Sequence, residues 1–128
     1  MSVRLEIVTA RPPDVSCGPL SSTVVRGGDF LFVAGLSAVD PQTGQPLRGT
    51  TAGETRQILE SLRQLLEVSG SSLDKVVKVN VLLASMLEAP NMNDVYARFF
   101  AEPPPARTVC GARLPDGVKV IIECTALA

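Results

Sequence analysis

The sequence predicts a two-layer α+β domain in which two amphipathic helices cover one face of a β-sheet. Two segments, near residues 51–69 and 89–101, carry apolar residues at helical spacing. Five shorter segments are alternately or continuously apolar, as strands are. The 128 residues are enough for one domain, residues 1–128, that buries about two thirds of its unfolded surface.

The N-terminal part predicts three strands. Residues 4–9 alternate between charged and apolar side chains, which is typical of an edge strand, and residues 11–19 hold three prolines and are expected to form a loop. Residues 21–26 and 30–34 are expected to pair through a turn at residues 27–29. Residues 30–34 are apolar on both faces, which indicates a central strand covered on both sides.

The first helix is expected to begin near Thr51, after a turn at residues 40–44 in which proline fixes φ and glycine adopts a positive φ. Thr51 and Glu54 are expected to form a capping box. Gly70 is the expected residue just beyond the C-terminal end. The predicted buried stripe consists of five apolar residues at helical spacing: Ile58, Leu59, Leu62, Leu65 and Leu66.

The second half alternates strand and helix. Residues 75–84 predict a strand with Val77, Val79, Val81 and Leu83 on one face. Residues 89–101 predict a helix with Pro90 in its first turn, where a missing N–H costs little. Its expected buried stripe is Met92, Tyr96, Phe99 and Phe100.

The last strand is expected over residues 118–126, and the segment after Arg107 is a candidate for one more strand. The even-numbered residues of the last strand share one face, and Lys119, Ile121, Glu123 and Thr125 share the other.

One face of the predicted sheet mixes polar and apolar side chains. Its polar residues are Lys78, Asn80, Lys119 and Glu123. Such a face is too apolar to be fully hydrated and too polar for the core of a monomer, so we expect it to form an oligomer interface. The net charge of −1 lowers the barrier to self-association.

The composition also argues against several classes of function. A net charge of −1 with scattered charges gives no basic footprint for nucleic acid. No apolar run approaches the ~18 residues of a membrane span, and the N-terminus is charged where a signal peptide would be apolar. Cys17, Cys110 and Cys124 are widely spaced and no histidine accompanies them, which indicates free thiols in a cytoplasmic protein rather than a zinc site.

Arg107 is the strongest candidate functional residue. Three consecutive prolines, residues 103–105, precede it by one position, so its backbone is expected to be held in place. A guanidinium held in this way presents a planar fork that matches a carboxylate. The alternative is a structural ion pair.

Several segments, in this order and spacing, resemble the reactive-intermediate deaminase (Rid, or YjgF-like) family along nearly the whole chain. They are Ala34-Gly35, residues 40–44, 54–59 and 93–100, Pro105-Ala106-Arg107, Arg113-Leu114-Pro115 and the last strand with Glu123.

The resemblance implies a chorismate-mutase-like fold, assembled as a homotrimer with clefts between subunits. In the family these clefts hydrolyse enamines and imines such as 2-aminoacrylate to 2-keto acids and ammonia, without a metal or organic cofactor. The arginine that matches Arg107 binds the substrate carboxylate, which makes Arg107 the expected catalytic residue. The expected substrate-binding residues are Arg107, Asn93, Val109, Gly35, Leu20 and Ile121.

Several positions depart from the family pattern. Leu20 replaces a tyrosine, Ala34 replaces a serine, and Ile121 replaces the glutamate that orders the attacking water. Val109 replaces a cysteine, with Cys110 beside it, in a segment that is one residue shorter. These departures predict weak deaminase activity or an altered specificity. The alternative is a non-catalytic trimer that binds small carboxylates.

Three further residues have a functional and a structural reading. Glu123 lies on the same face as Ile121, displaced by about 6–7 Å along the strand, and either transfers protons or pairs with a lysine. Cys110 and Tyr96 are expected to be packing residues. RNA cleavage, proposed for some relatives, is disfavoured because the chain has neither histidine nor a basic patch.

Overall fold

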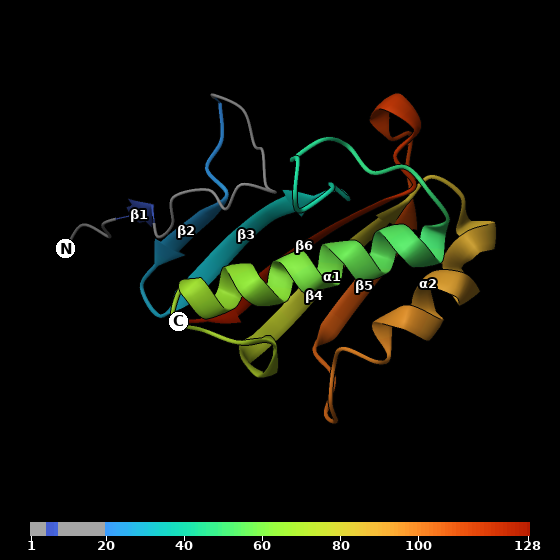
Figure 1. The fold of residues 1–128 in the computed structure, drawn as a ribbon. Helices are drawn as coiled ribbons and strands as arrows, with labels where there is room; N and C mark the ends of the chain where they lie inside the picture. The colour runs from blue at the N-terminus through green and yellow to red at the C-terminus, as the bar shows by residue number, and fades with distance from the viewer. Residues whose placement is uncertain (1–4, 8–19) are drawn as a thin grey trace.

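The computed structural model of the chain describes residues 5–7 and 20–128, which form a mixed six-stranded sheet with two α-helices on one face (Figure 1). The sheet order is β1-β2-β3-β6-β4-β5; β4 and β5 run parallel, and the other neighbours are antiparallel. The predicted α+β class is therefore confirmed. The elements are β1 (Leu5–Ile7), β2 (Val24–Gly27), β3 (Phe30–Leu36), α1 (Thr51–Val68), β4 (Val76–Leu83), α2 (Ala89–Tyr96), β5 (Ala106–Gly111) and β6 (Val120–Leu127).

The predicted turns and the additional strand are present. Gly28, at the β2–β3 turn, has φ +59, and Gly44 has φ +73, values that glycine adopts without strain. The strand expected after Arg107 exists as β5 and includes Arg107 itself. The expected loop over residues 11–19, with Cys17, lies outside the described residues.

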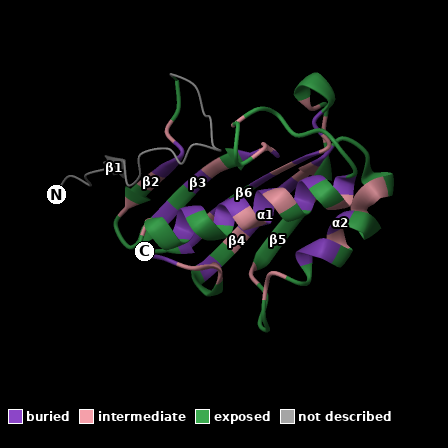
Figure 2. Cartoon of the chain, viewed as in Figure 1, coloured by how far each residue is buried: buried purple, intermediate pink, exposed green. Residues whose placement is uncertain are grey.

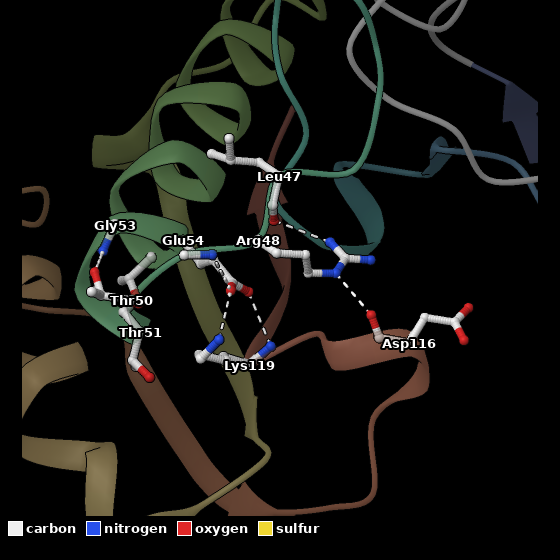
Figure 3. Close-up of polar contacts among 10 residues, drawn as sticks. Leu47, Arg48, Thr50, Thr51, Gly53, Glu54, Asp116 and Lys119 are labelled. Carbon is white, nitrogen blue, oxygen red and sulfur yellow. Dashed lines mark hydrogen bonds and ion pairs between the residues drawn. The ribbon is translucent and has the colours of Figure 1, made fainter.

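The predicted capping box at the start of α1 is wrong by one residue. Thr50 is the N-cap, and its hydroxyl accepts a hydrogen bond from the Gly53 amide at 3.0 Å (Figure 3). Glu54 is buried and accepts hydrogen bonds from the backbone amides of Gly49 and Lys119, at 3.2 and 3.0 Å. Glu54 therefore links α1 to the residue just before β6, and its carboxylate does not accept a hydrogen bond from the backbone amide of the N-cap residue. The C-terminal prediction is confirmed, with Gly70 at φ +85.

The core lies between the helices and the sheet. The predicted stripe of α1 is fully buried, and Met92 and Tyr96 of α2 extend the core. Figure 2 shows buried positions along the length of α1. The prediction for β4 is wrong at one position. The pairing of β4 with β6 shifts register between Val76 and Lys78, so Val76 takes the core position and Val77 is left 39% exposed. A bulge of this kind moves one side chain to the other face.

The other face of the sheet is open in a single chain. The prediction that β3 is covered on both sides is therefore wrong for the isolated subunit: Phe30 and Phe32 are 40% and 49% exposed. Polar side chains pair with one another on this face: Asn80 Nδ2 donates to Glu123 Oε1 at 2.8 Å, and Lys78 Nζ donates to Thr108 Oγ1 at 2.7 Å. Glu123 thus has an amide partner within the chain, and the lysine pair that the sequence suggested is not among the ion pairs of the described residues.

No helix within the described ranges has the length and apolar character needed to cross a bilayer.

Candidate functional site

Arg107 projects from the helix-covered face of the sheet. It pairs with Val79 across β4, and Val79 pairs with Cys124 of β6. Residues directly opposite one another in a ladder point to the same side, and both Val79 and Cys124 are buried in the core. Because β5 is an edge strand, the Arg107 side chain leaves this row beside α2 and remains exposed.

Two residues of α2 hold the Arg107 guanidinium. Its Nη1 donates to Asn93 Oδ1 at 2.7 Å, and its Cζ lies 4.8 Å from the centroid of the Tyr96 ring. Asn93 and Tyr96 are three positions apart and so lie on one side of the helix. Neither ion pair in the described part of the chain involves Arg107, so the structural ion pair considered as an alternative is not seen there. The guanidinium is therefore oriented and has no ion-pair partner among the residues that the structure describes.

A cavity of about 370 Å³ lies beside this guanidinium. The rings of Tyr96 and Phe100 pack with their centroids 4.7 Å apart in its wall. An apolar wall with a fixed planar cation suits a small carboxylate, which the remaining guanidinium N–H groups can bind. The lining residues are Asn93, Tyr96, Ala97, Phe100, Glu102, Pro104, Pro105 and Arg107.

Tyr96 acts in packing, as expected. It is 6% exposed, and its buried hydroxyl has no hydrogen-bond partner among the described residues. Burial raises the pKa of the Tyr96 hydroxyl, and the nearby Arg107 charge opposes this effect. The phenol therefore stays neutral near pH 7, and its ring serves as the surface on which Arg107 rests.

Gly35 and Ile121 meet on the opposite face of the sheet. Gly35 lies where the pairing of β3 with β6 shifts register, between Val33 and Leu36. A Cβ atom at Gly35 would be 2.8 Å from Ile121 Cγ2, so the isoleucine side chain lies directly against the glycine backbone. Ile121 pairs with Leu82 and shares the open face with Glu123.

One chain therefore does not bring all the predicted site residues together. Arg107 and Asn93 form one group, and Val109, two residues along β5, points to the same side and packs against the core. Gly35 and Ile121 form a second group on the other face. Leu20 is 98% exposed at the edge of the described region, and Cys110 is exposed on β5.

Part of the cavity was not predicted from the sequence. Ala97 and Glu102 line it, but neither was predicted to be a site residue. The helical spacing from Asn93 to Ala97 would have identified Ala97. Glu102 follows the end of α2 in an irregular segment, for which periodicity gives no signal.

The family model described as endoribonuclease L-PSP matches residues 10–128, which contain both groups of residues. A RutC family protein of Pyrococcus horikoshii is 39% identical to the chain over 122 residues, covering 94% of this chain and 96% of that protein. The chloroplastic Reactive Intermediate Deaminase A of Arabidopsis thaliana is 32% identical over 126 residues, covering 98% of this chain and 67% of that protein.

Solved structures resemble the fold over almost the whole chain. RidA from the Antarctic bacterium Psychrobacter sp. superposes with a TM-score of 0.87 at 27% identity, covering 96% of this chain and 99% of that one. Yeast Mmf1 superposes with a TM-score of 0.86 at 31% identity, covering 97% and 98%.

Proposed function

Because the chain belongs to the Rid (YjgF-like) family and has its chorismate-mutase-like fold, we propose that it hydrolyses reactive 2-imino acids and their enamine tautomers to 2-keto acids and ammonia. One observation supports this most directly: Arg107 is held by Asn93 and Tyr96, has no ion-pair partner among the described residues, and lines a cavity. Such an arginine suits the carboxylate that every 2-imino acid carries.

In the proposed reaction, the main task of the protein is to position the substrate. Arg107 binds the substrate carboxylate, while Asn93 and Tyr96 fix the direction of the guanidinium. Water adds to C2 of the protonated imine, and the carbinolamine collapses to the keto acid and ammonium. Positioning of this kind supplies several kcal/mol of barrier reduction. No metal or organic cofactor is required, because the imine is already an activated electrophile.

The proposed site is shared between subunits of a homotrimer. Arg107 and Ile121 lie on opposite faces of one sheet, so the two groups meet only if the open face of one subunit approaches the β5–α2 edge of another. Exposed apolar residues on the open face, Phe30, Phe32 and Leu127, suit such burial. Sedimentation should give three times the 13.5 kDa chain mass; a mass of one chain at micromolar concentration would contradict the shared site.

A second candidate function is binding of small carboxylates without turnover. The observation that favours it is the apolar character of the residues on the open face. There, Ile121 lies against Gly35, and the residue before Gly35 is Ala34. These side chains cannot order a water molecule, so we propose hydrolysis at least tenfold slower than in a standard family member.

RNA hydrolysis, which the name of the family model suggests, finds no support in a chain with no histidine and a net charge of −1. We place the activity in the cytoplasm, where widely spaced cysteines stay reduced.

The decisive experiment generates 2-iminobutanoate in the presence of the protein, by the action of a threonine dehydratase. Release of 2-ketobutyrate should accelerate with the parent chain and fall to the uncatalysed rate with Arg107→Ala. Arg98→Ala is the matched control, because it removes an exposed cation that does not line the cavity. If the parent binds 2-ketobutyrate but does not accelerate its release, the binding function is the correct one.

A further inference from the structure

We propose that the Arg107 cavity selects ligands with a second, positively charged end, so that the substrates are 2-imino acids derived from basic amino acids. For turnover, this inference rests on the proposed function; for binding, it stands independently. It begins from the observation that Arg107 and Glu102 line the same cavity.

Arg107 and Glu102 do not form an ion pair with one another. The two ion pairs in the described part of the chain are Arg63–Glu60 and Lys119–Glu54, so neither Arg107 nor Glu102 is in an ion pair there. Glu102 directly precedes Pro103, Pro104 and Pro105, and a following proline restricts the backbone of Glu102. The cavity therefore offers a fixed cation for one end of a ligand and an anion for the other.

A second carboxylate lies close to the proline segment. Glu102 also lines an adjoining groove of about 590 Å³, together with Asp74. The residues that line this groove include no lysine or arginine. A ligand cation that leaves the vicinity of Arg107 therefore moves toward two carboxylates and away from the guanidinium.

The wall between the charges suits an aliphatic chain that ends in a cation. The ring of Tyr96 already carries the Arg107 guanidinium at 4.8 Å. The neighbouring Phe100 ring lines both the cavity and the groove, and aromatic faces attract ammonium and guanidinium groups. Methylene groups bury well along apolar surface while the charged group reaches solvent and a carboxylate.

These features identify a class of ligand and a class of supplying reaction. The ligand carries a carboxylate for Arg107, several methylene groups for the Phe100 wall, and an ammonium or guanidinium for Glu102. Oxidation of a basic amino acid at Cα produces a 2-imino acid of this description. Hydrolysis would then release a basic 2-keto acid and ammonia.

Binding is tested first with unreactive probes that differ by one charge. Calorimetry at low ionic strength compares 6-aminohexanoate with hexanoate, and 5-aminopentanoate with pentanoate. An exposed carboxylate and an aromatic face should make the amino acids bind roughly three- to tenfold more tightly, and added salt should reduce the difference. Glu102→Gln should lower the affinity for 6-aminohexanoate to that for hexanoate, whereas Glu67→Gln, an exposed site on α1, should keep the preference.

Turnover is then tested with imines made by an L-amino-acid oxidase from arginine and from its neutral isostere citrulline. We expect kcat/KM to be at least threefold higher for the arginine-derived imine, and we expect Glu102→Gln to remove the difference. Equal affinities within each probe pair, or a preference that survives Glu102→Gln, would overturn this inference. If the probe preference holds and no imine is hydrolysed, the proposed function fails and the cavity assignment stands.

Discussion

Asn93→Asp provides the sharpest test of the Arg107 site, because it changes the charge and leaves the shape. Asn93 Oδ1 accepts a hydrogen bond from Arg107 Nη1 at 2.7 Å. An aspartate at this position keeps the acceptor and strengthens the contact, but it also adds a negative charge beside the guanidinium. A ligand carboxylate must then share the arginine with an internal one.

The expected loss of affinity follows from Coulomb's law. Two carboxylates on the same guanidinium lie roughly 5 Å apart, and at an effective dielectric constant of roughly 20–60 they repel by about 1–3 kcal/mol. This repulsion corresponds to a roughly 5- to 150-fold weaker affinity. Asn93→Ala removes only one orienting hydrogen bond, which is worth about 1 kcal/mol, and should weaken binding by about fivefold.

The assay is calorimetric titration with 2-ketobutyrate, the unreactive product, supported by thermal unfolding of each variant. We expect Asn93→Asp to bind more weakly than Asn93→Ala, while its melting temperature stays at or above that of the parent. If Asn93 only oriented the arginine, the order would reverse, because aspartate orients it better than alanine. Parent-like affinity in Asn93→Asp would show that the ligand carboxylate does not bind at Arg107.

Three further predictions concern the open face and the core. Ile121→Glu should raise the rate of imine hydrolysis at least tenfold, about 1.4 kcal/mol of barrier, in a keto-acid release assay; an unchanged rate would favour binding without turnover. Gly35→Ala should lower the free energy of unfolding by about 1–3 kcal/mol, because its Cβ would lie 2.8 Å from Ile121 Cγ2, and adding Ile121→Ala should restore most of the loss in denaturant titrations. Burial, together with the Glu123 charge, raises the pKa of Cys124 from 9.0 to about 12, so between these pH values the unfolded thiol ionises and the folded one does not. Stability should therefore fall as pH rises through this window, by about 1 kcal/mol at pH 10, and Cys124→Ala should remove that part of the slope.

The sequence predicted the elements whose signal is periodic. The buried stripe of α1, the alternation of β6 and the core positions Met92 and Tyr96 all follow from residue spacing, since burial on one side repeats every 3.6 or every 2 residues. Residue spacing did not predict the start of α1, because two neighbouring residues could each serve as its N-cap. Thr50 and Thr51 are both acceptable N-caps, and only the tertiary bonds of Glu54 to Gly49 and Lys119 show which one is used.

Other features depend on register between distant strands, which periodicity within one segment cannot give. Val77 has the correct spacing for the core, but the bulge beside it is a property of the β4–β6 pair. The position of Arg107 opposite Val79, with Ile121 opposite Leu82, likewise depends on how β5 and β6 align on β4. Spacing along the chain therefore did not predict that the two groups of site residues lie on opposite faces.

Because the two groups lie on opposite faces, the departures from the family pattern can be sorted by the face on which they lie. Arg107, the residue proposed to bind a carboxylate, lies against α2, where Asn93 accepts its hydrogen bond. Ala34 and Ile121, where the family resemblance leads us to expect polar residues, belong to the other face, where Ile121 lies against Gly35. In a shared cleft, one subunit would supply the anchor and its neighbour the wall from which water attacks. Binding and turnover would then depend on different subunits, so mixed trimers that contain Arg107→Ala and Ile121→Glu chains should hydrolyse imines fastest at clefts where an intact Arg107 faces a glutamate at position 121, at the slow parent rate where it faces Ile121, and not at clefts that lack Arg107.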